Sequence, residues 1–291
     1  MDRAKARTAA QILRMLPRER ITRALGHLTD ARVPAALLNP VLEIYTRAYN
    51  VDLSEAVIPE EGFGTFNEFF TRRLRDGRRP VDPDPSVLIS PADGRLDDAG
   101  PIDPSRTFVV KGQRYDANEL LGNADDAAVF GGGTYAIVYL SPRDYHRVHT
   151  PIDAEITHVR HIPGTLFPVN DFGVRHVPLL FARNERVVIM LRSKAFGSIA
   201  MVMVGAMIVG KITLTFDGPA RPAFGGVAIE RWYDESSRPK VARGDEIGAF
   251  LLGSTVVLLM ERPAQGAYDL VPGAVGSHVR FGQAIARRSN A

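Results

Sequence analysis

The chain has 291 residues, a formal net charge of +3 and a hydrophobic fraction of 45%. That fraction suffices for a globular core, whereas so mild a charge gives no support to a nucleic-acid-binding protein. Cysteine is absent, which excludes disulfides, thiolate metal sites and cysteine nucleophiles. The two longest apolar stretches, residues 199–209 and 250–260, are far shorter than the roughly 20 residues that a membrane-spanning helix needs.

The N-terminal segment is predicted to form helices with a basic surface. Ile21, Leu25 and Leu28 recur at spacings of four and three, which is typical of one helix face. An apolar face flanked by arginines suits a helix lying on an anionic membrane, although a helical hairpin docked on its own domain fits equally well. The charged residues of this segment are Arg3, Lys5, Arg7, Arg14, Arg18, Arg20, Arg23 and Arg32 against Asp2, Glu19 and Asp30.

Two more helices are expected in the first part of the chain, at residues 41–49 and 66–75. A stretch rich in Pro and Asp follows at residues 79–85 and is typical of a linker. We therefore expect a helical membrane-associating region at residues 1–78 and a separate catalytic domain at residues 84–291.

Beyond the linker, short apolar runs alternate with Gly, Pro and Asp, which is typical of antiparallel β structure. The predicted fold class is therefore α+β, with N-terminal helices followed by a mainly antiparallel, β-rich catalytic core. The chain contains neither GxGxxG nor a Walker sequence, so a doubly wound nucleotide-binding fold is not expected. The principal strands are expected at residues 87–90, 108–110, 134–140, 156–162, 186–192, 199–209, 212–216 and 255–260.

The segment SPRDYHRVHTP, which follows the strand expected at residues 134–140, is predicted to begin with a short helix. Ser141 and Asp144 match the spacing of a capping box at a helix N-terminus. In a helix, His146 and His149 would share one face. Two histidines at this spacing, with no third ligand nearby, are a poor zinc site. They are either core histidines or a pair of proton-transfer groups.

The run FLLGSTVVLLM at residues 250–260 is typical of a buried strand, but Gly253, Ser254 and Thr255 interrupt it. One interpretation is a bulge, with both hydroxyls bonded to the main chain. The other makes Ser254 a nucleophile that attacks the carbonyl of Gly253 and converts the amide into an ester. Elimination and hydrolysis would then leave a pyruvoyl group, an electron sink comparable to pyridoxal phosphate. The tripeptide alone leaves both interpretations open.

Asp93, His149 and Ser254 each lie at the end or the break of an expected strand, where a scaffold presents side chains to a common site. Taken alone, Asp93 followed by Gly94 is typical of a turn. An aspartate that orients a histidine, which deprotonates a serine, is the arrangement that activates a hydroxyl. A Ser-His-Asp lipid hydrolase uses the same arrangement, but Ser254 lies outside any GxSxG elbow.

Six segments together carry a resemblance to a known family. They are TFNEFFTRRLRDGRRPVD at residues 65–82, PADG at 91–94, YHRVHTP at 145–151, LFARNERVV at 180–188, MVGAMIVGKI at 203–212 and KVARGDEIGAFLLGSTVVLL at 240–259. On these segments the chain resembles the bacterial, pyruvoyl-dependent type of phosphatidylserine decarboxylase proenzyme. The likeness extends from about residue 41 to residue 260.

The resemblance implies a proenzyme that cleaves itself between Gly253 and Ser254. The products would be a β chain of residues 1–253 and an α chain of residues 254–291, held together as an α/β heterodimer that could dimerise further. The cofactor would be the covalent pyruvoyl group derived from Ser254, with no metal and no pyridoxal phosphate. Phosphatidylserine would form a Schiff base with this group, lose carbon dioxide and give phosphatidylethanolamine.

The resemblance also assigns roles to individual residues. Asp93, His149 and Ser254 would form the charge relay for self-cleavage. His146 is the candidate for contact with the substrate carboxylate or for proton donation. The segment PGTLFPVNDF, with Phe167 and Asn170, would form part of the substrate pocket.

A lipid with two acyl chains stays in its bilayer, so the resemblance favours the membrane interpretation of the N-terminal segment. We expect a peripheral protein on the cytoplasmic face of the bacterial inner membrane, with phosphatidylserine in an anionic membrane as its partner and no nucleic acid. Two alternatives stay open besides the hydrolase. One is a noncatalytic β-rich binding module with a membrane tether, and the other is a related decarboxylase that acts on another serine-headed lipid.

Overall fold

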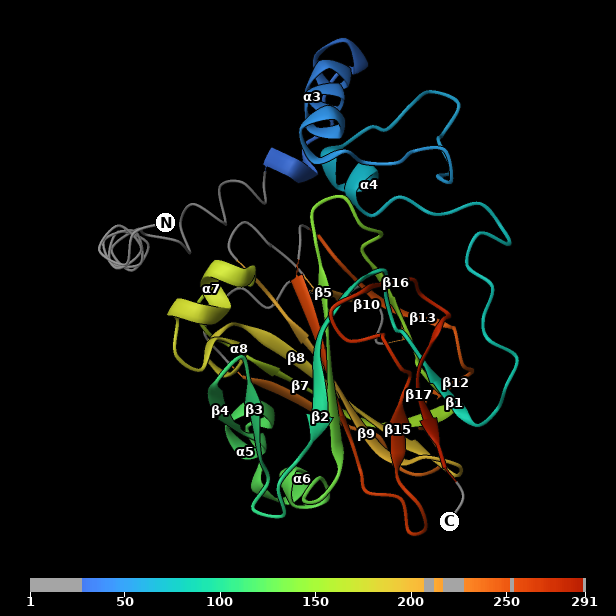
Figure 1. Cartoon of the computed structure of the whole chain (residues 1–291). Coiled ribbons are helices and arrows are strands. Elements are labelled where there is room, and N and C mark those ends of the chain that lie inside the picture. Colours follow the sequence, from blue (N-terminus) through green and yellow to red (C-terminus); the bar gives the residue numbers. More distant parts are fainter. Residues whose placement is uncertain (1–27, 207–211, 217–227, 252–253, 290–291) are drawn as a thin grey trace.

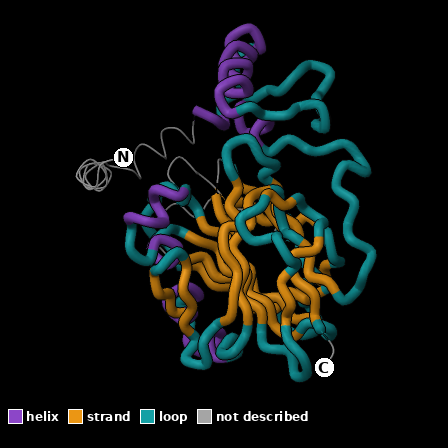
Figure 2. Tube along the Cα trace, viewed as in Figure 1, coloured by secondary structure: helices purple, strands orange, loops and turns teal. Residues whose placement is uncertain are grey.

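The computed structural model describes residues 28–206, 212–216, 228–251 and 254–289. Within these ranges, strands form the body of the molecule and helices lie around it (Figure 2). Two helices of the N-terminal part, α3 (Ala35–Tyr49) and α4 (Phe66–Phe70), lie at one end of this body (Figure 1). The predicted α+β class is thus confirmed. The basic helices predicted before residue 28 lie outside the described residues.

The largest sheet contains nine of the described strands, and all of its pairs are antiparallel. Its order is β11-β7-β8-β9-β14-β5-β2-β16, and β12 also pairs with β7. The strands are β2 (Gly94–Pro101), β5 (Thr134–Leu140), β7 (Ala154–Ile162), β8 (Arg186–Ser193), β9 (Gly197–Val204), β11 (Ile229–Trp232), β12 (Lys240–Val241), β14 (Ser254–Met260) and β16 (His278–Val279).

Three smaller antiparallel sheets complete the described β structure. The first pairs β1 (Val87–Ile89), β17 (Ala284–Arg288) and β15 (Tyr268–Leu270), and the second pairs β10 (Ile212–Leu214), β13 (Glu246–Phe250) and β6 (Arg147–His149). The third consists of β3 (Thr107–Val110) and β4 (Gln113–Asp116). Four short helices lie beside the strands: α5 (Ala117–Leu121), α6 (Ala124–Ala128), α7 (Asp171–His176) and α8 (Leu180–Arg183).

Strand β14 occupies the centre of the large sheet, between β5 and β9, and all seven of its residues are buried. Its apolar side chains face the core on both sides of the sheet, which is the environment that favours a continuous apolar run. However, residues 250–260 do not form one strand. β13 ends at Phe250 in one sheet, and β14 begins at Ser254 in another. The chain therefore changes sheets between Phe250 and Ser254, and Gly253 lies outside the described residues.

The short helix predicted at SPRDYHRVHTP is wrong. Ser141 and Asp144 do bond as a capping box would, since the Asp144 carboxylate accepts from the amide and the hydroxyl of Ser141 at 2.7 and 2.6 Å. They close a turn instead of a helix, and residues 147–149 then form β6. Pairing with β13 supplies the main-chain partners that a helix would otherwise have provided.

The helix predicted at residues 66–75 is only partly confirmed, because α4 ends at Phe70. Thr71 terminates it, with its amide and hydroxyl both bonded to the carbonyl of Asn67. A long loop then leads from α4 to β1 along one side of the molecule (Figure 2).

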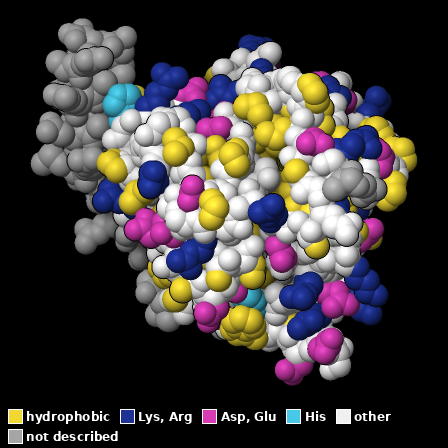
Figure 3. All heavy atoms as spheres, turned by 60° about the horizontal axis from the view of Figure 1, so that its bottom comes forward, with side chains coloured by type: hydrophobic (Ala, Val, Ile, Leu, Met, Phe, Trp, Pro, Cys, Tyr) yellow, Lys and Arg dark blue, Asp and Glu magenta, His cyan; other side chains and the backbone are white. Residues whose placement is uncertain are grey.

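On the face that Figure 3 presents, basic and acidic side chains are interspersed, with apolar side chains scattered among them. Among the helices that the structure describes, none combines the length and the apolar character needed to cross a bilayer.

Candidate active site

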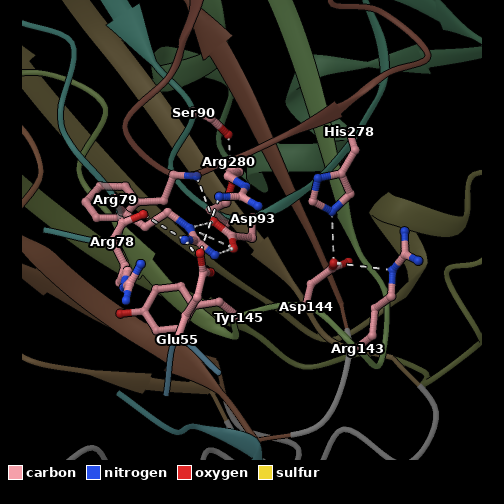
Figure 4. A network of polar contacts seen from close by, with 12 residues as sticks. Glu55, Arg78, Arg79, Ser90, Asp93, Arg143, Asp144, Tyr145, His278 and Arg280 are labelled. Carbon is pink, nitrogen blue, oxygen red and sulfur yellow. Dashed lines mark hydrogen bonds and ion pairs between the residues drawn. The ribbon is translucent and has the colours of Figure 1, made fainter. Parts of the chain in front are cut away.

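Asp93 lies in the turn between β1 and β2, and its side chain is almost fully buried. Arg79 binds both carboxylate oxygens: its Nε lies 2.9 Å from Oδ1 and 3.0 Å from Oδ2, and its Nη2 lies 2.6 Å from Oδ2 (Figure 4). The amide of Phe281 donates to Oδ1 at 2.8 Å. On its other side, Arg79 Nη1 lies 2.8 Å from Glu55 Oε2. Asp93 is therefore held by a bidentate ion pair and a main-chain donor.

His149, the last residue of β6, is buried with both ring nitrogens bonded. Its Nδ1 donates to the carbonyl of Gly244 at 2.8 Å, so in the neutral ring Nε2 accepts from the Tyr145 hydroxyl at 3.1 Å. Its ring stacks on Phe281, with 3.6 Å between centroids. Burial lowers the pKa of His149, and the Gly244 carbonyl, Glu246 and, to a smaller extent, Asp93 oppose this effect. The neutral ring is the form that can act as a general base.

Ser254 is the first residue of β14 and is fully buried, opposite Leu140 of β5. Within the described residues, neither its Oγ nor that of Thr255 (Oγ1) has a hydrogen-bond partner. The bulge interpretation, in which both hydroxyls bond to the main chain, therefore finds no support in the described part of the chain. A buried hydroxyl without a partner costs about 1–3 kcal/mol and is more typical of a functional group than of a structural one.

The structure brings Asp93 and His149 together around Phe281, whose amide bonds the carboxylate and whose ring stacks on the imidazole. In the described chain no hydrogen bond joins the two side chains directly, because their polar atoms are bonded to other groups. Ser254 is likewise not hydrogen-bonded to His149. The geometry thus holds the aspartate and the histidine in place and leaves the serine unbound.

His146 is completely buried beside Phe70, with 3.9 Å between ring centroids. Its Nδ1 donates to the carbonyl of Asp144 at 2.8 Å, which leaves a lone pair on Nε2. That nitrogen has no partner among the residues described. Burial lowers the pKa of His146 to about 3, so the ring is neutral near pH 7.

Two contacts join the segment of residues 140–146 to the two strands that flank the break, β13 and β14. The amide of Phe250 donates to the carbonyl of His146 at 3.0 Å, and Ser254 pairs with Leu140. The segment from residue 140 to residue 146 is therefore attached to the chain on both sides of the Gly-Ser pair.

The two residues predicted for the substrate pocket have structural partners. Phe167 belongs to the hydrophobic core, and the side chain of Asn184 bonds both its amide and its carbonyl. Asn170 is exposed and caps α7 by accepting from the amide of Gly173 at 3.0 Å. Their place in a substrate pocket stays a prediction.

Two small cavities adjoin the site, with volumes of about 220 and 200 Å³. Arg79 and Tyr145 line both of them. Neither residue was identified from the sequence, because nothing local indicates that Arg79 lies against Asp93 or that Tyr145 bonds the base. Within the described ranges, no group of three or more His, Asp and Glu side chains is placed to hold a metal ion.

Comparison with known proteins gives one consistent result. The sequence profile of the phosphatidylserine decarboxylase family matches residues 66–287. The phosphatidylserine decarboxylase proenzyme of Acidovorax ebreus is 43% identical over 278 residues, covering 94% of this chain and 95% of that protein. Those of Azotobacter vinelandii and Bordetella petrii are 42% and 41% identical, covering 94% and 93% of this chain and 96% and 93% of their own lengths.

Proposed function

The chain belongs to the phosphatidylserine decarboxylase family, and from this premise we propose that it is a proenzyme that converts phosphatidylserine into phosphatidylethanolamine. Its cofactor is a pyruvoyl group that the chain makes from its own Ser254. One observation carries the proposal at the level of residues: the Ser254 hydroxyl is buried and unbonded in the described structure, where the chain passes from one sheet to another.

Self-cleavage begins when Ser254 Oγ attacks the carbonyl carbon of Gly253. The peptide C–N bond breaks as the acyl group moves to oxygen, which gives an ester and a free amine. Removal of the Cα proton of residue 254 expels the Gly253 carboxylate and leaves dehydroalanine. Its imine tautomer reacts with water, and ammonia leaves to give the pyruvoyl ketone. The glycine has no side chain to obstruct the first step.

His149 is the proposed base for the attack. Its neutral ring carries a lone pair on Nε2, which at present accepts from Tyr145. The Gly244 carbonyl, Glu246 and, to a smaller extent, Asp93 favour the protonated ring that forms when the serine loses its proton, because each raises the pKa of the buried imidazole. Arg79 and Phe281 fix the position of the Asp93 carboxylate.

The pyruvoyl group supplies a ketone that captures the substrate amine and accepts the electron pair released with carbon dioxide. His146 is the proposed proton-transfer residue of this second reaction. Its ring is neutral in the free protein, with a lone pair on Nε2. A substrate carboxylate beside it would raise its pKa, and the ring, once protonated at Nε2, could then donate a proton to the substrate Cα. Contact with the substrate carboxylate would likewise need a proton on Nε2.

We further propose that α3 contacts the membrane, because the substrate has two acyl chains and stays in the bilayer. Leu38 and Leu42 point into the protein, whereas Leu37, Val41 and Ile44 are 65%, 51% and 70% exposed. The exposed three recur at spacings of four and three and so form a second apolar face. Such a face suits the interface of a bilayer, and the basic N-terminal segment fits the anionic cytoplasmic leaflet.

The proposal is tested with the purified chain and its Ser254→Ala variant. Intact-mass spectrometry of the parental protein is expected to give two chains divided after residue 253, the smaller one beginning with a ketone in place of the serine amine. The variant is expected to stay at full length. Only the cleaved protein should form phosphatidylethanolamine from vesicles containing phosphatidylserine.

A single full-length species in both samples, after prolonged incubation, would show that residue 254 forms no cofactor. In that event, labelling of Ser254 by a fluorophosphonate would indicate the hydrolase alternative.

A further inference from the structure

Arg72 is a buried cation with unsatisfied donors. It follows α4 directly, and only 4% of its surface is exposed. Its Nη2 donates to the carbonyl of Arg143 at 2.9 Å and makes a weaker contact of 3.5 Å with that of Asp144. Neither Nε nor Nη1 has a hydrogen-bond partner in the described structure, and both atoms are inaccessible to solvent. Burial lowers the pKa of Arg72, although a guanidinium remains charged at any physiological pH.

This guanidinium lines the cavity of about 220 Å³ beside Asp93. Each of the four acidic side chains that line this cavity is bonded to another group, and Asp52 accepts from the amide of Ser54 at 2.8 Å. Asp93 and Glu55 bind Arg79, and the Asp144 carboxylate accepts from Ser141 and lies 2.9 Å from His278 Nε2 (Figure 4). No carboxylate of the described chain forms an ion pair with Arg72.

Arg72 has a neighbour, His146, that also carries an unpartnered buried nitrogen, although His146 itself does not line the cavity. The carbonyl oxygen of Asp144 accepts from His146 Nδ1 at 2.8 Å and contacts Arg72 Nη2 at 3.5 Å. The side chains of Arg72 and His146 therefore approach the same carbonyl oxygen. The positive charge of Arg72 also contributes to the low pKa of His146. Each presents at least one buried nitrogen without a partner among the described residues.

We propose that Arg72 is the anion-binding residue of the substrate site and that its guanidinium binds an oxyanion of the phosphatidylserine headgroup through an N–H donor that has no partner in the described structure. The phosphate and the carboxylate share the required chemistry, because each is an anion whose oxygens accept from guanidinium N–H groups. Arg72 shares the carbonyl oxygen of Asp144 with His146, the proposed proton-transfer residue, so an anion held by Arg72 would be held near that ring. This inference rests on the proposed decarboxylase function.

The buried charge of Arg72 is only partly compensated, by two carbonyl oxygens, by the Phe69 ring at 5.7 Å and by carboxylates that do not form an ion pair with it. A buried charge is costly unless it is paired, and the penalty reaches several kcal/mol in real proteins. Water could satisfy the two donors but would not neutralise the charge. An anionic ligand does both, so the free protein bears a cost that the substrate removes on binding.

The test compares Arg72→Met and Arg72→Lys with the parental protein, and Arg78→Met, at a nearby exposed arginine, serves as the control. Self-cleavage is followed by intact mass, and decarboxylation is followed in mixed micelles of phosphatidylserine. We expect normal cleavage in all variants and an increase in KM of about ten- to a hundredfold in Arg72→Met, the range typical of lost charge-assisted hydrogen bonds. Arg72→Lys should recover part of this loss, and Arg78→Met should match the parent.

Stability and ligand binding are measured in the uncleaved Ser254→Ala background. Removal of the unpaired charge should leave the melting temperature unchanged or raise it, whereas loss of a structural residue would lower it. Soluble glycerophosphoserine should stabilise the protein that contains Arg72 and not the Arg72→Met form. Inorganic phosphate is tested in parallel.

An unchanged KM in Arg72→Met would overturn the inference. If inorganic phosphate also stabilised the protein that contains Arg72, the site would bind a free anion and not the headgroup. Failure of the parental protein to cleave or to decarboxylate would instead refute the proposed function itself. The two failures are therefore distinguishable.

Discussion

Arg79 and Asp93 form a bidentate ion pair at the junction between the linker and the β-rich body, with both side chains more than nine-tenths buried. The pair joins the loop after α4 to the turn before β2. Glu55 extends it towards the N-terminal part of the chain, 2.8 Å from Arg79 Nη1. The carboxylate proposed to support self-cleavage is thus positioned by a residue that lies outside the predicted catalytic domain of residues 84–291.

Replacing Arg79 with Met is expected to destabilise the protein and to slow its maturation. The substitution leaves Asp93 buried with only the Phe281 amide as a partner, and breaking a buried pair in this way typically costs about 3–5 kcal/mol. Urea denaturation in the Ser254→Ala background should therefore show a lower midpoint with an unchanged slope. Arg78→Met provides the control, and equal midpoints in the two variants would contradict the structural role of the pair.

Replacing Tyr145 with Phe should change the pH dependence of self-cleavage. Burial lowers the pKa of His149, so the cleavage rate of the parental protein should fall only below the ordinary histidine value of about 6.5. The Tyr145 hydroxyl donates to Nε2 and so favours the neutral ring further. Its removal should shift the acid limb of the rate profile towards higher pH. An identical limb in both proteins would show that Tyr145 does not act on the base.

The burial of His146 predicts a loss of stability in mild acid. Its pKa is about 3 in the folded chain and about 6.5 when unfolded, so between these values the unfolded chain binds the additional proton. The free energy of unfolding is therefore highest above pH 6.5, and it falls by up to about 1.4 kcal/mol per pH unit as the pH is lowered below that value. Urea melts of Ser254→Ala between pH 7 and pH 4.5 should show this decline.

The same melts of a His146→Gln, Ser254→Ala protein provide the comparison. Other groups titrate identically in both proteins, so the variant should have the flatter profile. Parallel profiles would mean that His146 is protonated or exposed in the folded protein.

Much of the fold follows from local pattern. Strand β14 is expected from its apolar run, and β5 has the expected bounds. Both strands lie inside the large sheet, and a strand that is buried on both faces consists mainly of apolar residues. The turn at Ser141 shows the limit of this reasoning. A serine followed three residues later by an aspartate can close either a turn or a first helical turn, and only the pairing of β6 with β13 decides between them.

The site is predictable only in part for a related reason. Asp93, His149 and Ser254 can be proposed from the sequence because each lies at or next to the end of an element in a distinctive segment. Their partners are remote in sequence: Phe281 lies 188 residues from Asp93, and Gly244 lies 95 residues from His149. Arg72 likewise cannot be identified from the sequence. Its unsatisfied donors are apparent only in the structure, where the nearby carboxylates are bonded to other groups.

Membrane binding should depend on the exposed apolar face of α3. In a triple variant, Leu37, Val41 and Ile44 are all replaced by serine. The three positions face solvent, so the fold should be unaffected. Co-sedimentation with anionic liposomes should weaken by about tenfold or more, because apolar area is lost from the proposed contact face. Asn39→Ser, at an exposed polar position of the same helix, is the control. Deletion of residues 1–30 examines the basic segment separately, and its effect should diminish at high salt because that contribution is electrostatic. If the triple variant sediments like the parent at every salt concentration, α3 does not contact the bilayer, and the apolar face must be covered by another surface.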